Sequence, residues 1–169
     1  DENVVMKDYV RGNQKKAEGG NRERVMLSAG NGSRLLYAVV YRGGYKSITI
    51  EESKNVRKLK SSCAGHPEDK DGYGIETTTG QLGQGVGNAV GMAIAEEIYR
   101  KKIGSSLIDN KTYVIASDGD LMEGISNEAM SLDGHLKLKN QIVFFDNNKN
   151  SIEGSTSLSV SDNYKKRCE

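Results

Sequence analysis

Residues 113–148 read YVIASDGDLMEGISNEAMSLDGHLKLKNQIVFFDNN, in which two short apolar runs flank an amphipathic segment. The runs at residues 113–116 and 142–145 have the length and the aliphatic and aromatic content of buried strands. The segment between them, from about residue 121 to 138, has a stripe of apolar residues at helical spacing. The members of this stripe are Ile125, Ala129, Leu132 and Leu136. A strand, a helix and a strand in this order predict two parallel strands joined by a right-handed crossover.

A glycine-rich segment before this unit predicts a turn that leads into a long helix. Residues 80–99 read GQLGQGVGNAVGMAIAEEIY, and their apolar side chains recur at helical spacing, which predicts one buried face. The members of that face are Val86, Val90, Ala93, Ile94 and Ile98. A glycine inside a helix costs about 1 kcal/mol relative to alanine. So many glycines therefore indicate that another backbone or a ligand comes close to this helix.

The remaining patterns complete a single α/β domain. Five further segments are predicted before residue 80, namely an amphipathic pattern at 4–10, a polar loop at 11–20, a strand at 24–28 and helices at 33–41 and 51–59. A chain of 169 residues fits one domain. We therefore predict one domain over residues 1–169, a three-layer sandwich built on parallel βαβ connections.

Charge and cysteine content narrow the classes of function. The 24 Lys and Arg residues nearly balance the 23 Asp and Glu residues, so the net charge gives no reason to expect a nucleic acid or an anionic membrane as partner. No apolar run approaches the roughly 20 residues of a membrane span, and no signal-peptide pattern opens the chain. Cys63 and Cys168 form no CxxC pair, which predicts free thiols in a reducing compartment. We expect a cytoplasmic protein.

Polar residues follow both predicted strands, where an open parallel sheet binds its ligands. Asp118-Gly119 follows the first strand and Asn147-Asn148 the second. One carboxylate together with amide and carbonyl oxygens suits a hard divalent cation that also has phosphate oxygens among its ligands. The N-terminus of the helix that follows favours the binding of negative charge. The pattern indicates a Mg²⁺–diphosphate site. The alternative is that Asp118 only caps the helix and the asparagines only turn the chain.

A calcium-binding loop is a second interpretation of the polar residues after the second strand. Asp146, Asn148 and Asn150 have the one-three-five spacing of such a loop. Position six is Ser151 rather than Gly, and position twelve is Ser157 rather than Glu. Both differences exclude the calcium-loop interpretation.

Several motifs resemble those of transketolase, an enzyme that depends on thiamine diphosphate. Asp118-Gly119, followed after 27 residues by Asn147-Asn148, is similar to the family's cofactor motif, which starts Gly-Asp-Gly and ends Asn-Asn. Further segments resemble transketolase specifically, at residues 21–30, 64–68, 76–85, 121–129, 134–138 and 151–159. The resemblance is collinear over nearly the whole chain. It implies the central part of the N-terminal cofactor-binding (PP) domain, truncated here, of a pentose phosphate pathway enzyme that transfers a two-carbon ketol unit between sugar phosphates.

The resemblance also implies how the cofactor and its metal are held. The side chains of Asp118 and Asn148 match metal ligands, and Asn150 matches a residue that offers its backbone carbonyl to the same Mg²⁺ or Ca²⁺ ion. The remaining cofactor contacts are Gly119 against the diphosphate, Gly80 and Leu82 along the aminopyrimidine and thiazolium, and Asn31, where the family usually has a histidine that holds the diphosphate.

Three further residues match the catalytic apparatus of the family. His66 matches a histidine that faces the reacting carbon and hydrogen-bonds substrate hydroxyls. Glu123 and Glu128 match acidic residues of a subunit-interface network near the group that activates the aminopyrimidine. The alternative to these catalytic roles is that His66 is only a loop histidine before Pro67 and that Glu123 and Glu128 only occupy solvated helix positions.

The chain departs from the family pattern at positions that bear on cofactor binding. Asn31 lacks the imidazole that the family usually has there, and Asp120 is expected to add negative charge close to the phosphates. The other departures are Arg34 and Arg42 at usually apolar positions, Gln81 for Pro, Ser117 for the first Gly of the motif and Asn150 for an apolar residue. We therefore expect weakened binding of thiamine diphosphate.

The resemblance places further parts of the catalytic centre outside these 169 residues. The resemblance implies an N-terminal Gly-His-Pro segment with another active-site histidine, distinct from Gly65-His66-Pro67, and a second domain that supplies the aminopyrimidine-activating glutamate; neither is among these residues. We expect no turnover by this chain alone. Sugar phosphates would bind only in a complete enzyme, with a separate C-terminal half as partner. The alternative function is a non-catalytic, solubilised or engineered stand-alone module, for binding or as a scaffold, that has lost tight cofactor binding.

Overall fold

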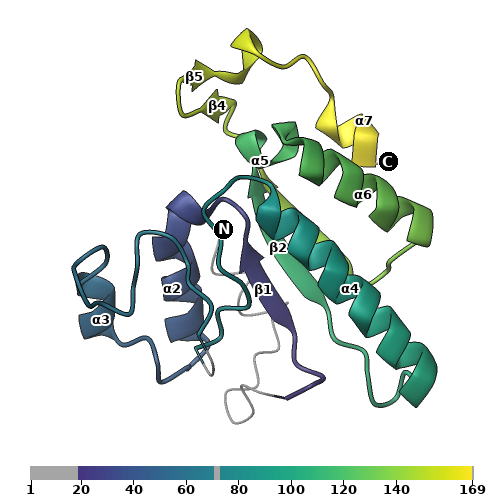
Figure 1. The fold of residues 1–169 in the computed structure, drawn as a ribbon, viewed down its shortest axis with the longest axis horizontal. Helices are drawn as coiled ribbons and strands as arrows, with labels where there is room; N and C mark the ends of the chain where they lie inside the picture. Colours follow the sequence, from purple (N-terminus) through teal and green to yellow (C-terminus); the bar gives the residue numbers. More distant parts are fainter. Residues whose placement is uncertain (1–18, 71–72, 169) are drawn as a thin grey trace.

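Three parallel strands form a sheet in the order β1-β2-β3 in the computed structural model, which describes residues 19–70 and 73–168 (Figure 1). The strands are β1 (Arg24–Leu27), β2 (Thr112–Ser117) and β3 (Gln141–Asp146). Leu27 of β1 lies opposite Ile115 of β2, and Ser117 of β2 lies opposite Asp146 of β3. The predicted parallel pair of β2 and β3 is confirmed, and β1 pairs with the other edge of β2.

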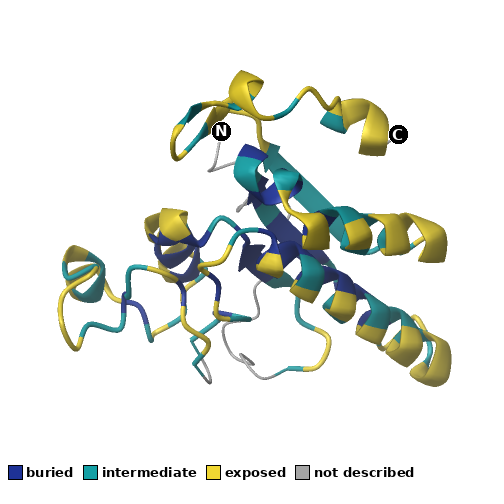
Figure 2. Ribbon diagram, turned by 45° about the horizontal axis from the view of Figure 1, so that its top comes forward, coloured by how far each residue is buried: buried dark blue, intermediate teal, exposed yellow. Residues whose placement is uncertain are grey.

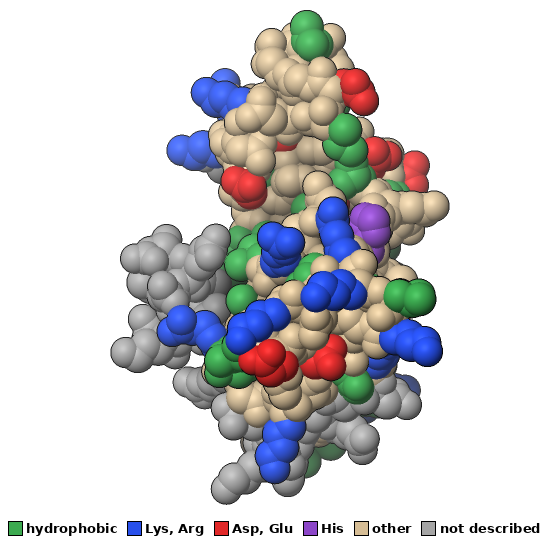
Figure 3. All heavy atoms as spheres, turned by 90° about the vertical axis from the view of Figure 1, so that its left-hand side faces the viewer, with side chains coloured by type: hydrophobic (Ala, Val, Ile, Leu, Met, Phe, Trp, Pro, Cys, Tyr) green, Lys and Arg blue, Asp and Glu red, His purple; other side chains and the backbone are tan. Residues whose placement is uncertain are grey.

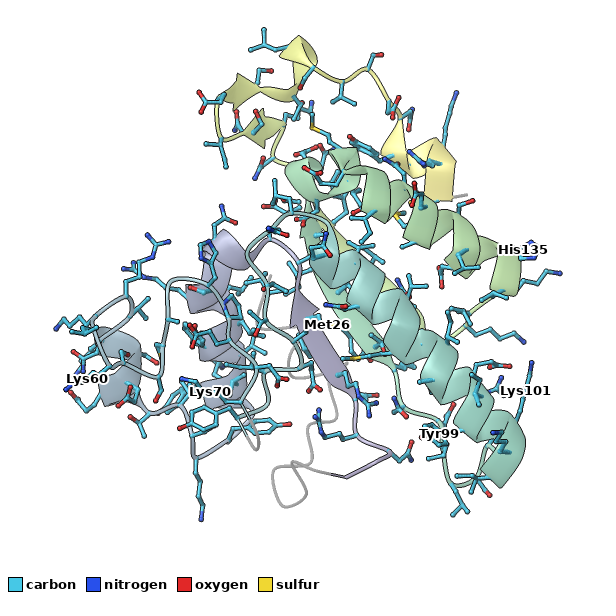
Figure 4. All side chains as sticks on the ribbon, viewed as in Figure 1. Met26, Lys60, Lys70, Tyr99, Lys101 and His135 are labelled. Atoms are coloured by element: carbon cyan, nitrogen blue, oxygen red, sulfur yellow. The ribbon has the colours of Figure 1, made fainter. Side chains whose placement is uncertain are left out.

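Helices cover both faces of this sheet, so the chain forms three layers, as predicted (Figures 1 and 2). The covering helices are α2 (Ser33–Arg42) on one face and α4 (Gln84–Ile103), α5 (Asp118–Met122) and α6 (Gly124–Leu136) on the other. Because side chains alternate along a strand, each face has its own core. Leu27 and Tyr113 pack with α2, whereas Met26 (labelled in Figure 4) and Val114 pack with the start of α4.

Helix α4 buries its predicted face over its first half only. Val86, Val90 and Ala93 are buried, but Ile98 is 46% exposed. The glycines at its start allow the close approach that the sequence predicts. A Cβ built at Gly85 would lie 2.6 Å from the Cα of Ser28, so α4 touches the backbone at the exit of β1. The close neighbour is another backbone.

The segment predicted as one helix over residues 121–138 is two helices. Helix α5 ends at Met122, and Glu123 has extended backbone angles (φ −71°, ψ 141°) before α6 begins. Three members of the predicted apolar stripe are exposed, namely Ile125, Leu132 and Leu136. Ile125 nevertheless lies against the start of α4, because its side chain would lie 2.9 Å from a Cβ built at Gly83 and 3.2 Å from one built at Gly87.

Helix α2 carries arginines on its outer face. Arg34 and Arg42 are exposed, while Leu36, Val39 and Val40 face the sheet. Figure 3 shows Lys and Arg side chains gathered on this side of the molecule. The two arginines therefore occupy solvated positions, where their charge needs no buried partner.

Short elements complete the described chain. They are η2 (Gly30–Gly32), α3 (Ile50–Lys54), the antiparallel pair β4 (Asn150–Ser151) and β5 (Gly154–Ser155), η3 (Thr156–Leu158) and α7 (Tyr164–Cys168). Helix α3 is shorter than the predicted 51–59, because Arg57 has a left-handed φ of 67°. The pattern predicted at residues 4–10 and most of the loop at 11–20 lie outside the described residues.

The structure bears on the expectations about cysteine thiols and about membrane-spanning helices. Cys63 is a buried free thiol and Cys168 an exposed one. Across the described part of the chain, no helix combines the length and the apolarity that a membrane crossing requires.

Candidate functional site

A cavity of about 470 Å³ lies at the carboxyl ends of the strands. Its walls come from five segments, namely the exit of β1, the loop that carries His66, the Gly80 turn before α4, the end of β2 and the loop after β3. The representative lining residues are Ala29, Asn31, Gly80, Leu82, Gly119 and Asn148. The cavity therefore occupies the place where the sequence predicts the ligand crevice.

Close backbone contacts fix the two walls on the β1 side. A Cβ built at Gly30 would lie 2.8 Å from the backbone nitrogen of Gly80, so the loop after β1 touches the Gly80 turn. Gly83 ends that turn with a φ of 79°, a conformation that side chains other than glycine adopt rarely. These glycines let two backbone segments meet at the edge of the cavity.

The predicted cofactor-lining residues converge in this cavity. The Cδ1 atom of Leu82 would lie 3.1 Å from a Cβ built at Gly119, and the ring of His66 would lie 3.4 Å from one built at Gly80. His66 is exposed and lines the cavity. The structure thus brings together His66, Gly80, Leu82 and Gly119, which come from three separate segments of the sequence.

The loop that carries His66 is anchored to α2. The Tyr37 hydroxyl donates a hydrogen bond to the carbonyl of Ala64 at 2.8 Å, and the Ser33 hydroxyl donates to the carbonyl of Gly65 at 3.0 Å. Burial raises the pKa of Tyr37 to about 12, so the phenol keeps its proton at neutral pH. The loop is held by hydroxyl donors that do not titrate in the physiological range.

Asp118 lies at the start of α5 and is 3% exposed. Its Oδ2 accepts a hydrogen bond from the backbone N–H of Lys149 at 2.8 Å. The end of β2 is thus joined directly to the loop that carries Asn148 and Asn150. The interpretation of Asp118 as a simple helix cap is wrong, because the cap of α5 is Ser117.

Asn148 and Asn150 line the cavity and form a turn with each other. The Asn150 N–H donates to Oδ1 of Asn148 at 2.9 Å, and Nδ2 of Asn148 donates to Asp146 at 3.1 Å. Among the described residues, no three His, Cys, Asp or Glu side chains cluster as a metal site. The Asp146 carboxylate lines the cavity with amide and carbonyl groups, and the buried Asp118 carboxylate lies beside the cavity without lining it. Oxygen donors of this kind suit a hard cation.

Asp120 differs from its sequence-based interpretation. Its carboxylate is fully buried and does not line the cavity. It accepts hydrogen bonds from the hydroxyl of Ser28, the N–H of Gly83 and both the N–H and the hydroxyl of Ser117. The sequence predicts negative charge from Asp120 close to the phosphates, and the structure places its carboxylate behind the cavity wall among protein donors, next to the lining residue Gly119.

The remaining predicted residues occupy the rim and the outer surface. Asn31 is exposed and lines the cavity. Glu123 and Glu128 are exposed at the start of α6 and do not line it. His135, labelled in Figure 4, lies at the end of α6 away from the cavity. Sequence reasoning missed Ser28, whose hydroxyl bonds to a residue 92 positions later and leaves no local signal.

Comparison with known proteins gives a consistent result. A family model described as "Transketolase, thiamine diphosphate binding domain" matches residues 2–169. The chain is 47% identical to a transketolase of Sinorhizobium medicae over 160 residues, which cover 95% of this chain and 23% of the relative.

Solved structures are similar over the same region. A transketolase of Campylobacter jejuni matches with a TM-score of 0.91 at 43% identity, covering 99% of this chain and 26% of that one. A transketolase of Pichia stipitis in complex with sedoheptulose-7-phosphate matches with a TM-score of 0.89 at 43% identity, covering 98% and 24%. The chain therefore spans about a quarter of the length of these proteins.

Proposed function

Because this chain belongs to the transketolase family, in which it matches the thiamine diphosphate binding domain, we propose that its cavity binds thiamine diphosphate with a Mg²⁺ or Ca²⁺ ion. The observation that carries the proposal is the convergence of Gly80, Leu82 and Gly119 on one cavity next to Asp118. Asp118 and Asn148 would hold the metal with their side chains, and Asn150 with its carbonyl.

The donor set fits this cofactor. Burying an ionised carboxylate costs free energy unless a positive charge or hydrogen-bond donors compensate it. The buried Oδ2 of Asp118 accepts its hydrogen bond from a neutral donor, the backbone N–H of Lys149. A divalent cation would offset its charge and share the diphosphate oxygens. Gly119 lines the cavity near the N-terminus of α5 and has no side chain, so a phosphate in the cavity would approach its backbone.

The residues around the cavity have distinct roles in this proposal. Thiamine diphosphate supplies stabilisation of a carbanion when it is bound. Leu82 and Gly80 would orient its rings, and the exposed imidazole of His66 would hydrogen-bond substrate hydroxyls at the cavity mouth. In a complete enzyme these contacts would serve transfer of a two-carbon ketol unit between sugar phosphates.

We propose that turnover needs a second domain, which supplies the glutamate that activates the aminopyrimidine. A separate C-terminal transketolase half would be a suitable partner. Glu123 and Glu128 are exposed at the start of α6, beside the Gly83 turn, where a partner surface would reach them. These two glutamates are proposed as interface residues rather than as residues of the cavity.

A second candidate function rests on Asn31. It lines the cavity where the resemblance implies a histidine that holds the diphosphate. With that donor replaced, the domain would act as a non-catalytic module without tight cofactor binding. Asp120, the other departure expected to weaken diphosphate binding, lies behind the cavity wall with its carboxylate among protein donors.

Calorimetric titration with thiamine diphosphate, with and without MgCl₂, tests the proposed function. We expect binding only when the metal is present, and we expect Asp118→Ala to abolish it. Asp162→Ala removes an exposed carboxylate that does not line the cavity and should leave binding unchanged. Absence of heat at millimolar cofactor with MgCl₂ would support the non-catalytic module instead.

A further inference from the structure

The four hydrogen bonds to Asp120 join three segments of the chain. Oδ1 accepts from the Ser28 hydroxyl at 2.7 Å and from the Gly83 N–H at 2.8 Å. Oδ2 accepts from the Ser117 N–H at 2.9 Å and from its hydroxyl at 2.8 Å. Ser28 follows β1, Gly83 precedes α4 and Ser117 ends β2. The Ser28 N–H still donates to the carbonyl of Ile115 at 2.9 Å at the end of the β1–β2 ladder, and the Asp120 carboxylate joins this strand pair to the turn before α4.

Each of these three segments also builds a wall of the cavity. Leu27 and Ala29 flank Ser28, and Leu82 immediately precedes Gly83. Ser117 itself lines the cavity, as does Gly119 next to Asp120. The carboxylate stands behind the walls and faces away from the space they enclose.

The chemistry of the site favours a carboxylate over other side chains. A fully buried charge is costly unless donors surround it, and Asp120 has one donor for each of four acceptor positions. Among the described ion pairs, none involves Asp120. Gly83 is the N-cap of α4, so the partial positive charge of that 20-residue helix adds to the neutral donors.

We propose that Asp120 is a positioning residue of the cofactor site: its buried carboxylate sets the spacing between the β1 exit, the Leu82 turn and the end of β2. The proposal rests on the proposed function for its effect on cofactor binding, but its effect on the cavity walls is independent of any ligand. Asp120 acts through Leu82, Ala29 and Gly119, and it does not touch the cofactor.

Asp120→Asn tests this role with little change of shape. The carboxamide offers one acceptor and one donor group, so either orientation turns an N–H toward donors that the carboxylate now accepts from. We expect hydrogen exchange of the Gly83 and Ser117 amides to accelerate at least tenfold in the free protein, relative to that of Val114 in the core. The affinity for thiamine diphosphate with MgCl₂ should fall at least tenfold.

Matched controls separate positioning from general stability. Asp133→Asn makes the same chemical change on α6, away from the cavity, and should leave both measurements unchanged. Val90→Ala weakens the core of α4 and should lower the melting temperature without reducing the cofactor affinity. If Asp120→Asn does not fold, Ser28→Ala removes a single donor and should accelerate Gly83 exchange to a smaller extent.

The outcomes are distinct. Unchanged exchange of Gly83 in Asp120→Asn would overturn the proposal, and so would an affinity loss in Val90→Ala equal to that in Asp120→Asn. If the unaltered chain gives no heat with thiamine diphosphate, the proposed function fails. The exchange rates would still decide whether Asp120 sets the cavity walls.

Discussion

At the scale of single residues, two aspartates two positions apart have opposite roles. Asp118 comes next to the cavity and meets the loop after β3, whereas Asp120 is turned into the protein. The reasoning that parallel strands place polar residues at one edge predicted the position of Asp118. It failed for Asp120, because Gly83 and Ser28 lie 37 and 92 positions away in the sequence. A local signal existed, since Ser117-x-x-Asp120 is the pattern of a capping box.

Replacing Asn31 tests most directly what sets the affinity of the cavity for thiamine diphosphate. Asn31→His restores the imidazole that the resemblance implies, at an exposed position on the cavity rim. A charge-assisted hydrogen bond to a phosphate contributes about 1.5–3 kcal/mol, so the affinity for thiamine diphosphate should rise by about tenfold or more. Calorimetry at pH 6.5 measures the change. Unaltered or weaker affinity would mean that the diphosphate does not reach this rim.

At the scale of elements, spacing along the sequence predicts which residues share a face, but it does not show what covers that face. The strands and α4 follow their patterns because the sheet itself provides the cover. The stripe on α6 has the same spacing, but Leu132 and Leu136 remain exposed, and only Ile125 lies against the start of α4. The pairing of β1 with β2 was likewise beyond local sequence, because the two strands are separated by α2, α3 and α4.

The contact between α4 and β1 gives a prediction about stability. In Gly85→Ala, the added Cβ would lie 2.6 Å from the Cα of Ser28, so backbone must shift. Overpacking of this kind costs about 1–3 kcal/mol of unfolding free energy. Gly91→Ala is the matched control on the same helix, where an added Cβ meets nothing within 4 Å, and it should stabilise by up to about 1 kcal/mol. Equal unfolding free energies of the two variants, measured by urea unfolding, would contradict the close contact between Gly85 and Ser28.

Glu96 on α4 gives a prediction about pH. Burial raises its pKa above the ordinary value of 4.5, although a hydrogen bond from Asn140 and the charge of Arg100 act in the opposite direction, and Glu97 and Asp109 raise it further. The folded protein therefore binds the proton more tightly than the unfolded chain does. Stability from this group is present at low pH and is lost as pH rises through the folded pKa.

The comparison with Glu96→Gln isolates this contribution. The unfolding free energy of the unaltered chain minus that of the variant should fall as pH rises from about 4.5, and it should level off above the folded pKa. Urea unfolding across this range at constant ionic strength provides the curve. A difference that increases with pH would show that the folded protein lowers this pKa.

At the scale of the whole molecule, the sheet and the cavity place the predicted cofactor residues together while leaving the glutamates of α6 outside. His66, Gly80, Leu82, Gly119 and Asn148 come from four separate segments and line one space. The central claim is that a metal ion in this space joins Asp118 to the loop after β3 when thiamine diphosphate is present.

Paramagnetic broadening by Mn²⁺ in place of Mg²⁺ tests that claim most directly. In amide NMR spectra recorded with thiamine diphosphate, we predict that the strongest broadening falls on Asp118, Gly119 and residues 148–150. The same addition without the cofactor should broaden them much less. Strongest broadening at any other part of the chain, or none at these residues with the cofactor present, would contradict the account.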